Sequence, residues 1–119
     1  MKKLIFIFLL GSSSSVLAVT PPEMDSFTQP GIFQNWLQNR CIGKISQDKK
    51  LKDDAFKSAA SWLEVSHLPI DAFHKGDVLI DNYLKLKLSG SNGGEYNVLK
   101  CTFVSQSKES KAIFDKYNK

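Results

Sequence analysis

Apolar residues recur every three or four positions along most of this chain, which is the period of one face of an α-helix. One such series follows Pro30 and Gly31, which mark a helix start, and its members are Phe33, Trp36, Leu37, Cys41 and Ile45. A second series follows Asp53 and Asp54, acids suited to a helix N-terminus, and its members are Phe56, Ala59, Ala60 and Leu63. The pattern therefore predicts two helices in the first half of the chain.

Three further series predict three more helices. Asp71 is suited to cap the third, which continues toward Gly90 with inward positions at Val78 or Leu79, Ile80, Tyr83 and Leu84. The fourth is short and carries Cys101, and its apolar positions are Tyr96, Leu99 and Phe103. The fifth has Ile113, Phe114 and Tyr117. Because no stretch alternates with period two, we expect an all-α fold, a small bundle of about five helices.

The first 18 residues have the composition of an export signal. Lys2 and Lys3 give a positive start, an apolar run covers residues 4–10, and Val16-Leu17-Ala18 places small residues at a cleavage site. Seven apolar residues fall well short of the roughly 18 that cross a bilayer, so no stable membrane insertion is expected. We predict that residues 1–18 are a cleaved signal peptide and that residues 19–119 form one domain.

Export changes what the two cysteines, Cys41 and Cys101, are expected to do. In an oxidising compartment an even number of cysteines indicates a disulfide, whereas a structural zinc site needs four suitably spaced ligands. A Cys41–Cys101 bond spans 60 residues and, in the chain-entropy model, stabilises the fold by about 4 kcal/mol. Without a Cys-x-x-Cys motif the bond is expected to be structural, joining the first and fourth predicted helices, and no metal site is predicted.

The charge of the chain does not predict binding to nucleic acid. Of the 16 Lys and Arg residues, 14 remain after the leader is removed, against 12 Asp and Glu, so the net charge falls from +4 to about +2. The basic cluster Lys49-Lys50-x-Lys52 is followed at once by Asp53 and Asp54. Because basic residues elsewhere alternate with acidic ones, no basic stripe follows a phosphate backbone. The lysines of this cluster are interpreted as solvent-exposed residues at the start of a helix.

No arrangement of residues predicts an enzyme or a cofactor. His67, Asp71 and His74 come closest to a cluster, but Pro69 separates His67 from the other two, so the three do not share one regular helix. Asp77 and Asp81 stand four apart and share a helix face, which is typical of a solvated face or a partner contact. We therefore expect a binding protein.

Two features leave more than one interpretation open. Trp36 belongs to a predicted core stripe, whereas Trp62 lies one residue off its stripe and fits either a core or an interface. The segment Ser89-Gly90-Ser91-Asn92-Gly93-Gly94-Glu95 has the composition of a flexible connector. It also directly precedes the helix that carries Cys101, and a loop with one end held in place is suited to recognition.

Several short segments follow one another along the chain: Trp36 with Cys41-Ile42, Asp53-Asp54-Ala55, Ser58-Ala59-Ala60, Asp71-Ala72, Leu79-Ile80-Asp81-x-Tyr83-Leu84, Gly93-x-x-Tyr96-x-x-Leu99-Lys100-Cys101 and Ser107-Lys108-Glu109. In this order they resemble the immunity proteins of type VI secretion amidase effectors. The similarity runs from about Phe33 to Tyr117.

The resemblance implies a periplasmic, all-helical, homodimeric protein that inhibits its cognate effector, a peptidoglycan amidase of the fourth amidase effector family. Such an amidase is a cysteine peptidase that cuts the D-glutamate to diaminopimelate bond. In this family a loop of one subunit enters the amidase groove and a helix of the other subunit assists. On this sequence the loop would be Ser89 to Glu95, and the assisting helix would be Asp71 to Leu88 or the end of the preceding one.

Candidates for dimer or auxiliary contacts are Trp62 and Phe73, which are large apolar residues off the clearest stripes, together with Asp77 and Asp81. Three competing functions are an exported inhibitor or chaperone of another envelope enzyme such as a lysozyme, an envelope adaptor, and an enzyme that uses His67 or His74.

Overall fold

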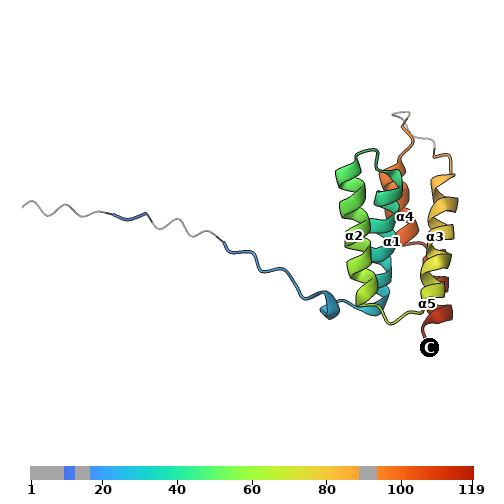
Figure 1. Ribbon diagram of the computed structural model, residues 1–119, viewed down its shortest axis with the longest axis horizontal. Helices are drawn as coiled ribbons and strands as arrows, with labels where there is room; N and C mark the ends of the chain where they lie inside the picture. Colours follow the sequence, from blue (N-terminus) through green and yellow to red (C-terminus); the bar gives the residue numbers. More distant parts are fainter. Residues whose placement is uncertain (1–9, 13–16, 89–93) are drawn as a thin grey trace, which may run out of the picture.

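The structure, a computed structural model, describes residues 10–12, 17–88 and 94–119. Most of the predicted signal peptide, and Ser89 to Gly93 of the predicted loop, lie outside the described residues. The elements are a 3-10 turn and five helices: η1 (Met24–Ser26), α1 (Gln29–Ile45), α2 (Lys49–Glu64), α3 (Ile70–Leu84), α4 (Asn97–Ser105) and α5 (Lys108–Tyr117) (Figure 1). The predicted all-α bundle of five helices is confirmed.

Helix α1 is the centre of the bundle, because it contacts each of the other four helices. The Thr28 side chain accepts a hydrogen bond from the Gly31 N–H at 3.2 Å, and Pro30 occupies the first turn, where its missing N–H costs nothing. The predicted apolar face is confirmed, since Phe33, Trp36, Leu37 and Cys41 are all buried. Ile45 is partly buried at the end of the helix.

Helix α2 begins four residues before the predicted start. Asp48, rather than Asp53 or Asp54, is the N-cap, and its carboxylate accepts the Leu51 N–H at 3.0 Å. The earlier start brings Lys52 to the Gly43 carbonyl near the end of α1, at 2.7 Å. Of the predicted stripe, Ala59 is buried, Phe56 and Leu63 are partly buried, and Ala60 is exposed.

Helix α3 ends at Leu84, six residues before Gly90, and Asp71 lies in its first turn instead of capping it. The N-cap is Pro69, which contributes no side-chain hydrogen bond. Leu79 and Ile80 face the core, whereas Val78 is 58% exposed. Of the two residues predicted as alternatives for the inward position, Leu79 therefore faces inward and Val78 does not.

Helix α5 follows α4 almost directly, and its start is set by a side-chain cap. Ser107 accepts the Ser110 N–H at 3.0 Å. The predicted apolar face is confirmed: Phe114 is buried, and Ile113 and Tyr117 pack against the core. Tyr83 on α3 donates a hydrogen bond to Glu109 at 2.9 Å, which connects α3 to α5.

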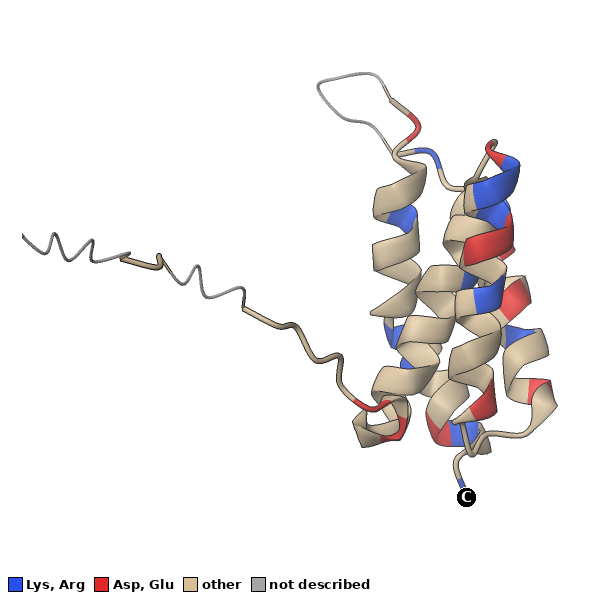
Figure 2. Cartoon of the chain, turned by 60° about the vertical axis from the view of Figure 1, so that its left-hand side comes forward, with Lys and Arg blue, Asp and Glu red and all other residues tan. Residues whose placement is uncertain are grey.

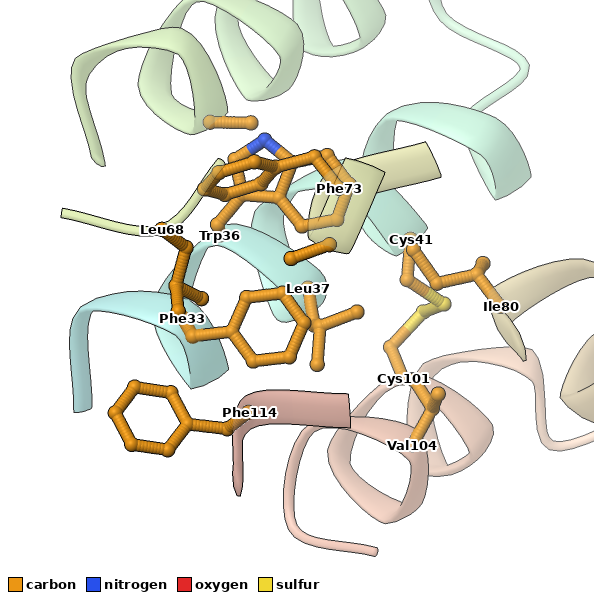
Figure 3. Close-up of a cluster of buried hydrophobic side chains, with 12 residues drawn as sticks. Phe33, Trp36, Leu37, Cys41, Leu68, Phe73, Ile80, Cys101, Val104 and Phe114 are labelled. Carbon is orange, nitrogen blue, oxygen red and sulfur yellow. A yellow bond between two sulfur atoms is a disulfide. The ribbon is translucent and has the colours of Figure 1, made fainter. Parts of the chain in front are cut away.

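The predicted disulfide joins Cys41 of α1 to Cys101 of α4 within the buried cluster, beside Ile80 and Val104, with the two Cα atoms 5.4 Å apart (Figure 3). Both cysteines are fully buried. Leu37, Ile80 and Val104 belong to the same buried cluster. The bond and the apolar core therefore stabilise the same contact between α1 and α4.

Phe73 was expected at a dimer surface, and the structure corrects this. Only 3% of its surface is exposed, and its ring packs edge-on against Trp36 at 4.9 Å and Phe33 at 5.8 Å between ring centres. The α3 face that carries Phe73 is turned toward α1, so this side chain is core.

Trp62 is partly buried, and Phe27 packs edge-on against it at 5.0 Å. Trp36, predicted as core, is buried.

Two helical glycines allow close approach of aromatic side chains. A Cβ atom at Gly76 of α3 would lie 2.8 Å from Trp36 Cζ3 and 3.1 Å from Leu37 Cδ2. At Gly43 of α1 it would lie 2.5 Å from the ring of Phe56. The distances to the two aromatic rings, below 3.0 Å, are shorter than the contacts that real Cβ atoms make, so a side chain at either position would have to displace a ring.

Replacing both cysteines, as in the Cys41→Ser, Cys101→Ser variant, is expected to lower the free energy of unfolding by up to about 4 kcal/mol, because the unfolded chain loses its 60-residue cross-link. Urea unfolding followed by circular dichroism measures the change. Unmodified protein treated with a reductant is the matched control and should move in the same direction. An unchanged unfolding midpoint in both samples would contradict a stabilising role.

The Gly76→Ala variant is expected to be less stable by about 1 kcal/mol. Alanine gains about 1 kcal/mol in helix propensity, but the overpacking against Trp36 costs about 1–3 kcal/mol. Val78→Ala, at an exposed position of the same helix, should change stability by no more than about 0.5 kcal/mol. Thermal unfolding of the two variants compares them, and a Gly76→Ala protein as stable as the parent contradicts the packing argument.

Candidate binding surface

The connection between α3 and α4 lies at one end of the bundle, beside the turn between α1 and α2 (Figure 1). Its described residues are 85–88 and 94–96. Leu86 is 46% exposed, and Gly94 and Glu95 are exposed as well. Tyr96 enters α4 with a φ of 57°, a left-handed conformation that turns the chain sharply into the helix. Exposed residues therefore lie on both sides of the segment outside the described residues, and Gly94 and Glu95 among them belong to the predicted loop.

The two flanks of this connection face one another across a concavity of about 300 Å³. Its lining residues are Leu86, Lys87, Leu88, Gly94, Glu95 and Lys100. The Glu95 carboxylate accepts a hydrogen bond from the Asn97 side-chain amide at 3.2 Å. Of the seven predicted loop residues, Gly94 and Glu95 are thus placed at the surface, and Ser89 to Gly93 stay a prediction.

The outer face of α4 continues this surface with apolar side chains. Val98 is 67% exposed, Leu99 41% and Phe103 44%. The one charged residue of α4, Lys100, points inward, and the helix directly beneath the grey trace in Figure 2 is accordingly almost entirely tan. An exposed apolar helix face next to an exposed connection is typical of a protein-binding surface.

The predicted apolar face of α4 was wrong. Leu99 and Phe103 were expected to face inward, but the buried positions are Lys100, Cys101, Val104 and Ser105. With about 100° of rotation per residue, positions two before and two after Cys101 lie on the opposite side of the helix. Because the disulfide turns Cys101 toward α1, Leu99 and Phe103 are directed outward. The predicted disulfide was therefore enough to indicate that Leu99 and Phe103 face outward.

Asp77 and Asp81, expected to be solvated or to contact a partner, form ion pairs with α1. Arg40 Nε lies 2.8 Å from Asp77 Oδ1 and its Nη2 lies 3.3 Å from Oδ2, a two-point contact. Lys44 Nζ lies 2.8 Å from Asp81 Oδ1. The matching spacing of four residues between the two bases and between the two acids was readable in the sequence and was missed. Both carboxylates stay partly exposed, so auxiliary contacts through them remain a prediction.

A second concavity, of about 250 Å³, separates α2 from α3 above α1. Trp36 and Arg40 of α1 are among its lining residues, with Phe56 on one side and His74 on the other. The Arg40 guanidinium lies 4.7 Å from the centre of the Phe56 ring, a cation–π contact. The guanidinium is therefore already held by Phe56 and Asp77.

The histidines that were weighed as a catalytic cluster are dispersed. His67 lies in the connection before α3, Asp71 and His74 lie on α3, and all three are exposed. Within residues 10–12, 17–88 and 94–119, no group of three His, Cys, Asp or Glu side chains is arranged to hold a metal ion. In the same part of the chain no helix is both long and apolar enough to cross a membrane.

The perturbed ionisable groups are structural. Burial raises the pKa of Tyr83 above 10.0, with a further rise from its contact with Glu109. A backbone hydrogen bond, and then the Tyr83 hydroxyl, lower the pKa of Glu109. A hydrogen bond from Lys49 lowers the pKa of Asp53 in the same way. The Tyr83–Glu109 contact joins α3 to α5, and the Lys49–Asp53 contact lies at the start of α2. None of these contacts lies on the α3–α4 connection.

The fold and this surface define a small disulfide-bonded helical binding protein. Residues 31–114 match the model of the type VI secretion system (T6SS) amidase immunity protein family, Tai4. The chain therefore belongs to this family, as the sequence resemblance indicated. Among the curated proteins compared, none matches significantly.

Solved structures agree with this assignment. A chain in the crystal structure of the effector Tae4 from Salmonella typhimurium with the immunity protein Tai4 from Enterobacter cloacae is 47% identical, with a TM-score of 0.76 over 80% of this chain and 98% of that one. A chain in the Tae4–Tai4 complex from Enterobacter cloacae is also 47% identical, with a TM-score of 0.75 over 80% and 97%. A chain in the Tae4/Tai4 structure from Salmonella typhimurium, 23% identical with a TM-score of 0.73 over 82% and 96%, shares the fold.

The Asp77→Asn variant is expected to lose about 1 kcal/mol of stability, because Arg40 and Lys44 lose the carboxylate they share between α1 and α3. Asp115→Asn, which breaks the exposed pair with Lys111 within α5, is the matched control and should lose no more than about 0.5 kcal/mol. Urea unfolding at low and high salt measures both. Equal losses at low salt would show that the contact between helices adds nothing.

Proposed function

We propose that this immunity protein acts in the periplasm as a homodimer that binds and occludes the active-site groove of a Tae4-type peptidoglycan amidase. The amidase cuts the D-glutamate to diaminopimelate bond of cell-wall peptides. Its inhibition protects the producing cell and its sisters from intoxication. The observation that carries the proposal is the 47% identity to chains of solved Tae4–Tai4 complexes over nearly their whole length.

The connection from Ser89 to Glu95 is the proposed inhibitory loop. Three of its seven residues are glycines, and a glycine without Cβ can approach the walls of a peptidase groove closely. The C-terminal end of the loop leads into α4, which the disulfide holds on α1. Restraint at this end reduces the ordering cost that binding has to overcome.

Helix α3 is the proposed assisting helix of the second subunit. Its outer face exposes Val78 and Ile70, at 58% and 55%, next to the partly exposed carboxylates of Asp77 and Asp81. Trp62 stays a candidate dimer contact, whereas the buried Phe73 does not. The dimer itself rests on the resemblance of the sequence to this family, and light scattering of the purified protein tests it.

Export to the periplasm rests on two observations. The first 18 residues have the pattern of a cleavable signal peptide. The Cys41–Cys101 bond belongs to an oxidising compartment. Fractionation of cells that express the whole chain, together with the mass of the recovered protein, tests both the location and the cleavage site.

Binding of the purified protein to a Tae4-type amidase, followed by an assay of peptidoglycan hydrolysis, tests the function directly. Stoichiometric inhibition is the expected result. A protein that neither binds nor inhibits any such amidase would overturn the proposal and favour an inhibitor of another envelope enzyme.

Deleting Ser91 to Gly94 is expected to abolish inhibition and to leave the helix content and the unfolding midpoint unchanged, because the deletion lies between α3 and α4. The same hydrolysis assay measures it. A variant with His67, an exposed residue in the connection before α3, replaced by Ala is the control, and it should inhibit fully. Full inhibition by the deletion variant would show that another surface blocks the amidase.

A further inference from the structure

Lys100 is an unusual residue for the interior of a small protein. It lies between Leu99 and Cys101 on α4, and only 4% of its surface is exposed. A buried ammonium group is costly unless hydrogen bonds replace its water. The contacts of Lys100 therefore indicate why the fold retains a charge at this position.

The Lys100 ammonium group bridges the two helices that flank the candidate loop. Its Nζ donates to the backbone carbonyl of Leu84 at 3.3 Å and to the side-chain Oδ1 of Asn97 at 3.3 Å. Leu84 is the last residue of α3, and Asn97 is the first residue of α4. The carbonyls at a helix C-terminus carry partial negative charge and lack partners within the helix, so a cation is favoured there.

The same contact determines the orientation of the Asn97 amide. Oδ1 accepts from Lys100, and Nδ2 donates to Glu95 Oε2 at 3.2 Å. The reverse orientation would place the amide NH₂ against an ammonium group and the amide oxygen against a carboxylate. Both contacts would be repulsive, so Lys100 and Glu95 together permit one orientation. A continuous series of contacts therefore runs from the end of α3 through Lys100 and Asn97 to Glu95.

The position of Lys100 is itself determined by the scaffold. Its neighbour Cys101 is bonded to Cys41, so the backbone of α4 at this point is held against α1. Both flanks of the connection, at Leu86 to Leu88 and at Gly94 and Glu95, line the same concavity as Lys100. Lys100 thus joins the rigid part of the molecule to both ends of the connection.

We propose that Lys100 is a positioning residue, which holds the two ends of the 85–96 connection together and, through Asn97, presents the Glu95 carboxylate to the amidase. The role of Glu95 rests on the proposed function. The part of the proposal in which Lys100 holds the two ends of the connection together does not depend on that function.

The Lys100→Met variant tests the first part. Methionine fills a similar volume without a charge or a donor. We expect faster amide hydrogen exchange at residues 84–88 and 94–97, with exchange in α1 and α2 unchanged. Lys57→Met removes the same charge from an exposed position on α2, away from the connection, and is the matched control. Exchange of Lys100→Met equal to that of the parent would overturn the proposal.

The Asn97→Asp variant tests the second part. An aspartate keeps an acceptor for Lys100, but it removes the donor to Glu95 and places a second carboxylate beside it. We expect exchange near that of the parent and a loss of amidase affinity of about tenfold or more, as for Lys100→Met, against less than about twofold for Lys57→Met. Binding kinetics measured with the mature proteins provide these values.

The outcomes separate the possible errors. Faster exchange in Lys100→Met with parental amidase affinity in both variants would show that Glu95 is not positioned for binding. If Lys100→Met does not fold, Asn97→Asp decides alone, and parental affinity there overturns the role of Glu95. If the parent binds no amidase, the proposed function fails, while the exchange experiment still tests the connection.

Discussion

The contact between α1 and α4 determines how the rest of the molecule is arranged, and the Cys41–Cys101 disulfide lies in the middle of it. Helix α1 contacts every other helix, so whatever is bonded to it is held relative to the whole bundle. Helix α4 has only nine residues and would be marginal alone. The bond sets both its position and its rotation, which is why Lys100 and Val104 face inward while Leu99 and Phe103 face outward.

That rotation has consequences for binding. The outward face of α4 is apolar and continues into the exposed connection between α3 and α4, so one end of the molecule combines both features (Figure 2). On the inward face, Lys100 lines the same concavity as both flanks of this connection. The stable part of the molecule and its proposed recognition element therefore meet at two adjacent residues, Lys100 and Cys101.

The contact between α1 and α3 is made differently. Gly76 lets α3 lie close to Trp36, and the ion pairs of Arg40 with Asp77 and of Lys44 with Asp81 lie at the edge of the apolar contact. Such partly exposed pairs contribute little energy but favour one register of the two helices, because acids and bases four residues apart match in only one alignment. The groove between α2 and α3 remains open beside them.

The sequence by itself determined the helical class, the disulfide and the family. It also determined the inward faces of α1 and α5, because a single apolar stripe at helical spacing permits one rotation of a helix. The caps were harder to predict, since Asp48, Asp53 and Asp54 all suit a helix start. In the structure Asp48 is the cap, and its carboxylate accepts the Leu51 N–H. Helix α4 has apolar residues on every side, so its periodicity was ambiguous and indicated the wrong face. Only the long-range contact with α1 decided that Phe103 is exposed and Lys100 is buried, just as the packing of α3 on α1 decided that Phe73 is core.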